Sequence, residues 1–399
     1  MTGPQNSAGH LLNLIRSGQA DTRGALQALT GLSRSTVGLR LDALLRAGWV
    51  REAGGTASTG GRPSTRLEFD SHHALVLTAD LETTHARAAL VDLAGHVVAE
   101  TGDRLDIADG PEKVLDHLGS LFAALLSQTA TPADRVCGIG LSVPGPVDFA
   151  TGRVILPPIM PGWDGHPIGE TLQRALATHT GTAAPPVPVL VDNDANLMAL
   201  AEQRRHHADC GAFVLVKVGT GIGAGVIVDG AVYRGIDGGA GDIGHIRLHD
   251  RENARCMCGS HGCLAAVASG RALAGQLSAL GVPARSGSDV RALLAGGQPD
   301  AVRLAREAGQ RCGEVLVTVV SLLNPGVLMI AGDLAETHFV TGVRELLYQR
   351  ALPRSTRGLQ VVTSHLGDRA GLAGAACMVV DHLYSPAQAD ARLAARPTA

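Results

Sequence analysis

The sequence predicts an α/β protein in which a winged helix-turn-helix at the N-terminus precedes two α/β lobes. Three amphipathic segments and two strand-like segments fill the first 70 residues, and strand-like and helix-like segments then alternate along most of the remaining chain. The 399 residues are 45% hydrophobic and 18% charged, so the chain can bury a sizeable core. That balance excludes a disordered, weakly hydrophobic polymer.

Charge is unevenly distributed along the chain. Eight arginines against five acidic residues give residues 1–70 a net charge of +3, whereas 26 basic and 32 acidic residues give the remainder −6. A basic DNA-reading module attached to an acidic sensor or enzyme would show this asymmetry, although chance variation gives the same count. The formal net charge of −3 excludes a uniformly basic nucleic-acid binder, and 3% aromatic residues leave few stacking platforms for single strands.

No feature of the sequence indicates a membrane or an oxidising compartment. The chain lacks a run of about 18 uncharged apolar residues, and its N-terminus has no basic start followed by an apolar signal core. The seven cysteines are an odd number, with three of them inside eight residues, which favours reduced thiols and one metal site over a disulfide framework. We therefore expect a cytoplasmic protein with no membrane partner.

The helix-turn-helix is predicted from local signals. Apolar spacing indicates helices over His10–Ile15, Arg23–Leu29 and Arg34–Arg46, and Thr22 and Ser33 can cap the second and third. The third helix has one apolar side and one polar side, which we interpret as a recognition helix whose first residues contact base edges in the major groove. A solvated helix face is the alternative. The polar side consists of Arg34, Ser35, Thr36, Gly38 and Arg40.

A β-wing is predicted after the third helix. Two strand-like segments, Trp49–Glu52 and Arg66–Phe69, are joined by the Gly/Ser/Thr-rich segment Gly54–Pro63. Within that segment Arg62 could enter a narrow A·T-rich minor groove, although a domain linker explains the same residues. The helices and the wing together predict a DNA-binding domain over residues 1–70.

Two α/β lobes are predicted beyond the wing, one over residues 71–195 and one over residues 196–369. A C-terminal helix near 370–385 should complete the first lobe, and the Ala/Arg-rich tail after Ser385 is of low complexity. Strands are predicted at Ala74–Ala79, Ala86–Asp92, Val136–Ser142, Val189–Val191, Ala212–Val218, Gly225–Val228 and Val327–Ala331. Helices are predicted at Pro111–Leu126, Ile168–Ala177, Gly270–Leu280 and Val302–Leu323.

A cluster of one histidine and three cysteines predicts a metal site. His245, Cys256, Cys258 and Cys263 supply an imidazole and three thiolates, the ligand set of a closed tetrahedral structural zinc site. Glycines between the cysteines give the turn freedom that wrapping one ion requires. Unliganded loop cysteines are the alternative interpretation. His261 lies inside the loop, and we expect it to face solvent, although spacing alone does not choose between the two histidines.

Further motifs recur through both predicted lobes. They are Ser142–Asp148, Trp163–Gly165, Asp192–Asn196, Val216–Val226, Gly238–His245, Asn324–Gly326 and Gly371–Ala376. Together with the cysteine cluster they resemble the signature of the ROK family, which unites sugar kinases and sugar-responsive repressors. The resemblance extends from residue 75 to about 380 and implies a two-lobed fold of the actin-like ATPase and sugar kinase type. The N-terminal module resembles that of the repressor branch.

The resemblance also implies which residues bind sugar. Asn193 and Asp194 match a pair that binds sugar hydroxyls, and Asp194 stands at the general-base position, where a carboxylate takes a proton from the attacking hydroxyl. Asp242 and His245 match a Glu-x-x-His motif that holds the sugar, with one imidazole nitrogen on zinc. Considered without the family, Asp192–Asn196 is a polar cap on a helix.

Three positions depart from the family pattern. The kinases carry an Asp-x-Gly-Gly-Thr phosphate loop where this chain has Asp80-Leu-Glu-Thr-Thr, so Glu82 places an anion where glycine backbone would approach phosphate. This departure predicts no catalytic residues and no kinase activity, and the Gly219–Gly225 turn is then retained architecture. Ala265 replaces an acidic sugar ligand and Asp242 shortens the usual Glu, which weakens only the case for a usual hexose.

These inferences predict a transcriptional regulator of the repressor kind. Its partners would be double-stranded operator DNA and a sugar or sugar phosphate effector. One helix-turn-helix contacts too few base pairs for specificity in a genome, so we expect a homodimer or homotetramer. The alternatives are an ATP-dependent sugar kinase with a fused DNA-binding domain and a ligand-independent architectural regulator, and a phosphoryl-transfer assay separates the first from the regulator.

Overall fold

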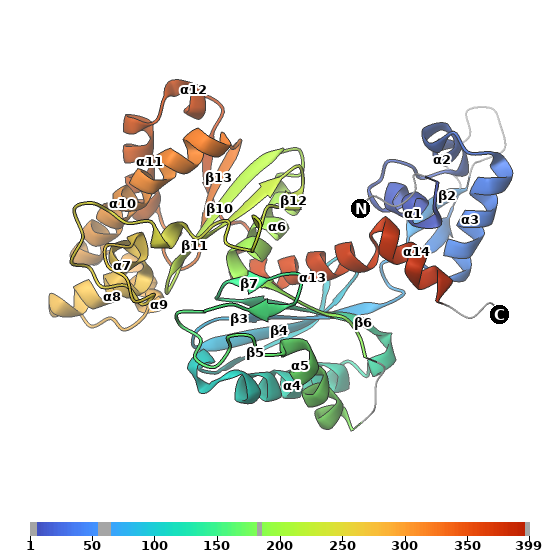
Figure 1. The fold of residues 1–399 in the computed structure, drawn as a ribbon, viewed down its shortest axis with the longest axis horizontal. Helices are drawn as coiled ribbons and strands as arrows, with labels where there is room; N and C mark the ends of the chain where they lie inside the picture. Colours follow the sequence, from blue (N-terminus) through green and yellow to red (C-terminus); the bar gives the residue numbers. More distant parts are fainter. Residues whose placement is uncertain (1–5, 55–64, 182–185, 396–399) are drawn as a thin grey trace.

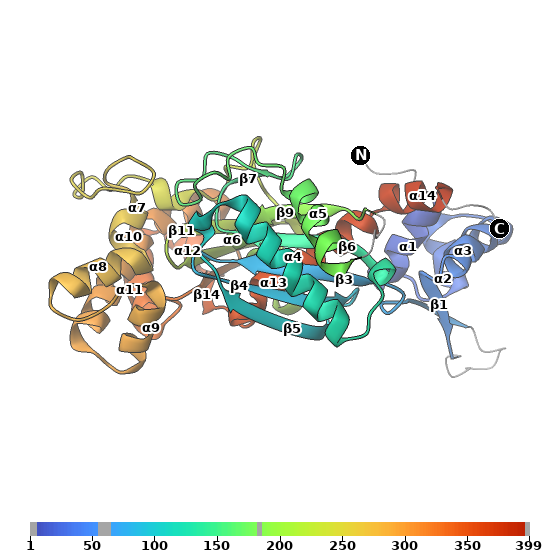
Figure 2. The same cartoon turned by 90° about the horizontal axis from the view of Figure 1, so that it is seen from below.

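The computed structural model describes residues 6–54, 65–181 and 186–395. A small N-terminal module lies at one end, a first lobe beside it and a second lobe at the far end (Figures 1 and 2). Within these ranges no helix combines the length and the apolar character needed to cross a membrane.

The N-terminal module begins with three helices, two of which start at the predicted caps. The hydroxyl of Thr22 accepts from the backbone N–H of Ala25 at 3.2 Å, and that of Ser33 accepts from Thr36 at 3.2 Å. Each cap satisfies a donor that the first helical turn leaves unpaired. The antiparallel pair β1–β2 then completes the predicted winged helix-turn-helix. The elements are α1 (Ala8–Arg16), α2 (Arg23–Thr30), α3 (Arg34–Arg46), β1 (Val50–Ala53) and β2 (Arg66–Phe69).

The first lobe is built on a five-stranded mixed sheet in the order β5-β4-β3-β6-β9. The strands β3, β6 and β9 run parallel, and β4 and β5 extend the sheet antiparallel. Helices α4 and α5 cover one face, and α13 covers the other (Figure 1). The elements are β3 (Leu75–Leu81), β4 (His85–Asp92), β5 (Val97–Arg104), α4 (Pro111–Gln128), β6 (Val136–Val143), β7 (Val147–Asp148), β8 (Arg153–Val154), α5 (Ile168–Thr180), β9 (Val189–Asn193) and α13 (Ala370–Leu383).

The second lobe repeats this plan with the sheet order β12-β11-β10-β13-β14. Its strand β13, between β10 and β14, is buried along its whole length, as expected for a strand with parallel neighbours and covered faces. The elements are α6 (Asp194–His206), β10 (Ala212–Val218), β11 (Ile222–Val228), β12 (Ala231–Val232), α7 (Leu264–Ala268), α8 (Gly270–Ala279), α9 (Gly287–Ala295), α10 (Pro299–Leu323), β13 (Val327–Ala331), α11 (Thr337–Arg350), α12 (Pro353–Thr356) and β14 (Gln360–Thr363).

Two central helices, α6 and α13, join the lobes. They cross closely because Gly374 has no side chain: a Cβ there would overlap the carbonyl oxygen of Leu197. Buried side chains of both helices, including Ala375 and Met378, form one apolar cluster with Phe213 of β10. The predicted two-lobed α/β fold is confirmed by these elements, and its lobes meet at this helix pair.

Several elements were not predicted from the sequence, among them α9, α11, β14, β5 and a helix at the end of the described chain. The strand β5 lies at the edge of its sheet and is largely exposed, so it lacks the apolar alternation that indicates a strand. The Ala/Arg-rich tail forms a further helix, α14 (Pro386–Ala394), which packs against α1. There the backbone N–H of Gly9 donates to Asp390 at 2.8 Å, and a Cβ on Gly9 would overlap the carbonyl oxygen of Pro386.

An aromatic cluster fixes the N-terminal module to the end of α13. The ring of Tyr384 packs edge-on against Trp49 and Phe69, with centroids 5.5 and 5.1 Å apart. Its hydroxyl is hydrogen-bonded to His73 at 2.6 Å. The guanidinium of Arg392, on α14, lies 4.9 Å from the Trp49 and Tyr384 ring centroids. Such edge-to-face and cation–π contacts orient the module against α13 and α14.

Candidate functional site

A cleft of about 390 Å³ lies between the two lobes. It opens at the carboxyl ends of the parallel strands β3, β6 and β9 of one sheet and of β10 and β13 of the other. This is where open α/β sheets bind ligands, because loops and helix N-termini converge there. All four residues assigned to sugar binding from the sequence line this cleft: Asn193, Asp194, Asp242 and His245.

Asn193 serves as the N-cap of α6 as well as lining the cleft. Its side-chain oxygen accepts from the backbone N–H of Ala195 at 2.9 Å and of Asn196 at 3.4 Å. Its amide nitrogen donates to the carbonyl of Gly145 at 3.1 Å. The helix-cap interpretation is thus correct for Asn193, and it orients the side chain at the cleft floor.

Asp194 is held by an ion pair that the sequence analysis did not identify. Its carboxylate lies 2.6 Å from Nζ of Lys217, which comes from β10 of the second lobe. Burial alone would lower the pKa of Lys217, but Asp194 and the nearby Asp80 and Glu82 raise it above its ordinary value. The ammonium is therefore charged and spans the cleft. A lysine inside the apolar run of β10 was the only sequence signal, and its partners lie far away in the chain.

The turn after β3 carries charge where the kinase pattern has glycines. Burial would raise the pKa of Glu82, yet the hydrogen bond to His85 and the charge of Lys217 lower it to about 2, so Glu82 is anionic at neutral pH. Next to this carboxylate, the hydroxyls of Thr83 and Thr220 lie 3.1 Å apart and bridge the lobes. An anionic side chain and two hydroxyl groups therefore lie in this part of the cleft.

Asp80 is the deepest acid in the same turn. Burial raises its pKa to about 6, against the lowering effect of Lys217. The carboxylate is 5% exposed and lies against Gly371 at the start of α13, where a Cβ would overlap its oxygen. The first turn of α13 is therefore in direct contact with a side chain that lines the cleft.

A second ion pair joins Arg234 to Asp192, the residue before Asn193 in the chain. Arg234 donates from Nε and Nη2 to Asp192 at 2.9 and 2.7 Å and lies 3.9 Å from the ring centroid of Phe149. The other oxygen of Asp192 accepts from Asn196 at 3.1 Å. Asp192 and Asn196 are thus structural, and Arg234 is a further residue that the sequence analysis missed.

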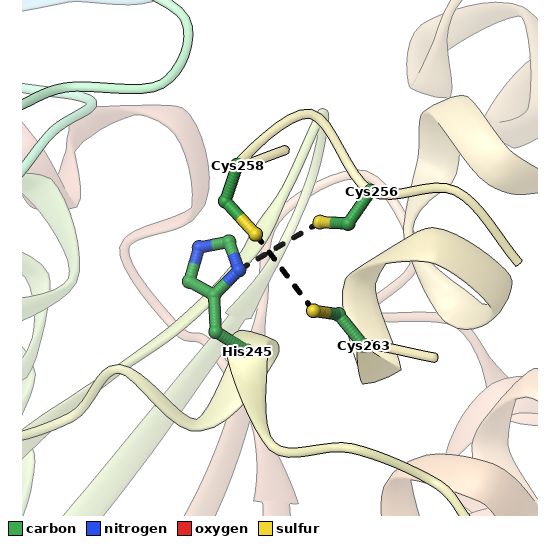
Figure 3. A group of neighbouring side chains, drawn as sticks. All are labelled: His245, Cys256, Cys258 and Cys263. Carbon is green, nitrogen blue, oxygen red and sulfur yellow. Dashed lines mark hydrogen bonds between the residues drawn. The ribbon is translucent and has the colours of Figure 1, made fainter. Parts of the chain in front are cut away.

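The predicted metal ligands converge on one point. The ligand atoms of His245, Cys256, Cys258 and Cys263 all lie within 4.8 Å of one another, so the group could hold a metal ion (Figure 3). Sulfur–sulfur and sulfur–nitrogen separations of 3.8 and 3.7 Å match the roughly 3.8 Å edge of a tetrahedron with bonds of about 2.3 Å. His261 is exposed and lies outside this group.

The metal cluster is adjacent to the cleft. Nδ1 of His245 faces the sulfurs, while its other ring nitrogen points away from them (Figure 3). Gly241 and Gly244 press this loop against β11, because a Cβ on either would overlap a strand carbonyl. Ala265, which replaces an acidic family ligand, also lines the cleft and offers no polar atom there.

The predicted DNA contacts are unequally exposed. Arg34 and Ser35 are exposed, Thr36 and Gly38 are half-buried, and Arg40 is half-buried with Nη1 enclosed and unpaired among the described residues. Arg62 lies outside the described residues. The same face exposes a residue that was not selected from the sequence: Leu39 is 70% exposed.

Comparison with known proteins agrees with the motifs. Residues 76–382 match the ROK family. A putative xylose repressor of Caldicellulosiruptor sp. strain Rt8B.4 is 28% identical over 396 residues, which cover 94% of this chain and 95% of that protein. The similarity therefore spans the N-terminal module as well as both lobes.

Solved structures separate the two branches of this fold. A ROK family transcriptional regulator, a homologue of E. coli Mlc, superposes with a TM-score of 0.80 at 26% identity, covering 98% of this chain and 99% of that one. A ROK family glucokinase from Streptomyces griseus, solved with glucose and AMPPNP, gives 0.64 at 26% identity and covers 76% and 99%. The regulator thus matches a larger share of this chain than the kinase does.

Proposed function

The chain belongs to the ROK family, and we propose that it is a cytoplasmic transcriptional repressor that binds double-stranded operator DNA and is released by a sugar or sugar phosphate. The N-terminal module carries this proposal. It presents a capped recognition helix, α3, and is fixed through Tyr384 to the helix α13 that begins at the cleft. A ligand in the cleft can therefore bias the position of the DNA-binding helices.

The competing proposal is a sugar kinase with a fused DNA-binding domain, since a glucokinase shares the lobes. A general base must be free to accept a proton, whereas the carboxylate of Asp194 is already engaged by the ammonium of Lys217 at 2.6 Å. Phosphates would also meet the anionic Glu82 in place of backbone donors. Both features disfavour phosphoryl transfer.

We assign effector binding to Asn193, Asp194, Asp242 and His245. They line one cleft and offer carboxylate, amide and imidazole groups suited to sugar hydroxyls. The cleft lies between lobes that are joined by α6, by α13 and by side-chain bridges such as Thr83 to Thr220. Ligand contacts with both lobes would therefore change the angle between them.

We propose that the ion held by His245 and the three cysteines is structural zinc. Three thiolates and an imidazole are soft ligands without an open position, the set that suits zinc with no redox chemistry. These residues would hold the loop that carries Asp242 and His245 against the cleft. The metal would thereby order a sugar-binding loop.

The domain boundaries and the assembly complete the proposal. We assign DNA binding to residues 1–70, the first lobe to 71–195 with α13, and the second lobe to 196–369. A homodimer or homotetramer would place two recognition helices on symmetric half-sites, because a single module contacts too few base pairs.

The decisive experiment uses the full chain with fragmented DNA from its source genome. Selection should enrich one inverted-repeat site, and a panel of sugars and sugar phosphates should contain a compound that releases the protein from it. Incubation with ATP and common hexoses or amino sugars should yield no phosphorylated product. Failure to enrich any site, or phosphoryl transfer at a kinase rate, would refute the proposal.

Replacing Asp194 tests the cleft. Asp194→Asn should keep the metal and the basal operator affinity but blunt the response to the releasing sugar, because an amide has one acceptor oxygen where a carboxylate has two. The exposed Asp209→Asn is the matched control and should respond like the wild type. An undiminished response in Asp194→Asn would leave Asp194 only a structural role.

A further inference from the structure

The exposed face of α3 forms one stripe centred on a leucine. Ser35, Leu39, Asp42 and Arg46 are all exposed and recur at the four- and three-residue spacing that places side chains on one line of a helix. Leu39 stands in the middle of this line and is 70% exposed. Single exposed leucines are ordinary on protein surfaces, so its place on the recognition helix is what gives it meaning.

Polar candidates beside Leu39 are partly engaged. The hydroxyls of Ser35 and Thr36 lie 2.9 and 2.8 Å from the hydroxyl of the cap residue Ser33. The side chain of Arg40 turns toward the module, where its Nη1 is enclosed. The exposed side chain of Leu39 thus lies among polar residues that are partly engaged within the module.

The residue before Leu39 is a glycine inside the helix. A Cβ on Gly38 would meet no atom within 4 Å, so packing does not require glycine there. Glycine also disfavours a helix relative to alanine, and an exposed leucine gains nothing from burial. Stability of the free module thus explains neither residue, whereas close approach to another surface explains both.

We propose that Leu39 recognises thymine, by packing on the C5-methyl group in the major groove, with Gly38 allowing the helix backbone to approach the base pairs. The thymine methyl is the apolar group that the major groove presents among hydrogen-bonding base edges. Arg46 at the end of the stripe and Arg34 beside its start are both exposed and suit contacts with phosphates. This inference rests on the proposed function, since it requires sequence-specific DNA binding.

The test removes single methyl groups from DNA. The full chain selects its site from a random double-stranded library, and each thymine of that site is then replaced in turn by deoxyuridine, which lacks only the methyl. At fixed salt, we expect one thymine position in each half-site at which the replacement weakens wild-type binding about fourfold. This is the expected effect of losing the burial of one methyl-sized group.

The same series is repeated with Leu39→Ala. This variant should bind the thymine site about fourfold or more weakly than the wild type, lose the deoxyuridine effect at that position, and keep its salt dependence and its affinity for random DNA. Leu29→Ala on α2, which removes a leucine that is 57% exposed, is the matched control and should retain the deoxyuridine effect. Equal melting temperatures confirm that both variants fold.

Each remaining outcome identifies what has failed. If no site is enriched, the proposed function and this inference fall together. If a site is enriched but lacks thymine in its half-sites, or if the deoxyuridine effect survives in Leu39→Ala, the inference alone is overturned and DNA recognition stands.

Discussion

Asp80 shows how one residue connects the cleft to stability. Its carboxyl group has an ordinary pKa of 3.8 that burial raises to about 6 in the folded protein. The folded state therefore binds the proton more tightly than the unfolded state, and the free energy of unfolding falls as the pH rises from about 4 to 6. Above that window the full cost of a buried charge is present.

Asp80→Asn should remove that cost. We expect the free energy of unfolding to rise by up to about 3 kcal/mol at pH 7.5 and to change little at pH 4, as measured by thermal or urea melting at both values. Asp148 gives a control of opposite sign, because the hydrogen bond from Thr151 lowers its pKa. Asp148→Asn should thus not stabilise the protein at pH 7.5, and equal effects at both pH values for Asp80→Asn would contradict the assignment.

The metal site makes a prediction about a single sulfur. Purified protein should contain about one zinc per chain, and Cys258→Ser should release it and disorder the loop carrying His245, because the fold of such loops depends on the ion. Elemental analysis and hydrogen exchange measure both effects. Cys210→Ser, outside the cluster, should retain the metal. A wild-type protein that folds and binds its operator without metal would refute this prediction.

Among the elements, α14 is a helix that the sequence did not predict, and it packs against the N-terminal module. Arg392 lies over the Trp49 and Tyr384 rings and donates to the carbonyl of Leu383 at 3.1 Å. Arg392→Ala should destabilise the N-terminal module by about 1–2 kcal/mol, seen as faster hydrogen exchange in α1. As the control, Arg303→Ala removes two exposed surface ion pairs, with Asp300 and Glu307, and should change hydrogen exchange in α1 little. Unchanged exchange in Arg392→Ala would mean that α14 packs independently of this stack.

The sequence predicted elements that local chemistry defines. The starts of α2 and α3 follow from caps a few residues away, Thr22 and Ser33, and the metal cluster from cysteines that are neighbours in the chain. The patterns of apolar residues predicted most strands, and the predicted strand ends lie within two or three residues of the observed ones.

What the sequence did not predict depends on distant partners. The pair between Asp194 and Lys217 forms only when α6 packs on the sheet of the second lobe, and the alanine-rich α14 packs with a defined face against α1. Leu39, which is 70% exposed on α3, was missed because an apolar residue was not expected on the polar side of that helix. Local patterns carry no information on such long-range packing.

At the scale of the whole molecule, one carboxylate links the cleft to the DNA-binding helices. Asp381 on α13 pairs with Arg16 of α1 at 3.0 Å through one oxygen and with Arg204 through the other. Arg204 lies near the end of α6, whose first residue is Asp194 in the cleft. A shift of α6 can therefore be transmitted to α1 through the carboxylate of Asp381, which pairs with an arginine of each helix.

Asp381→Asn should weaken this coupling. We expect the protein to bind both the operator and the sugar, but the effect of sugar on operator affinity should fall by about 0.5–2 kcal/mol, a typical change for a residue inside a coupling network. Operator titrations with and without the sugar measure it. Asp390→Ala, which loses the hydrogen bond from Gly9 but does not touch α6, is the control. Equal losses in both variants would assign the effect to loosening of the module.

The contact between α1 and α14 joins residues 381 positions apart in the chain, Gly9 and Asp390. A ribosome that adds about 5–20 residues per second needs roughly 20–75 seconds to synthesise the intervening segment. Throughout that interval the nascent DNA-binding helices lack the helix that covers them, and Trp49 lacks the partners contributed by Tyr384 and Arg392. A transcript cut short before α14 would therefore yield a chain whose N-terminal module lacks these contacts.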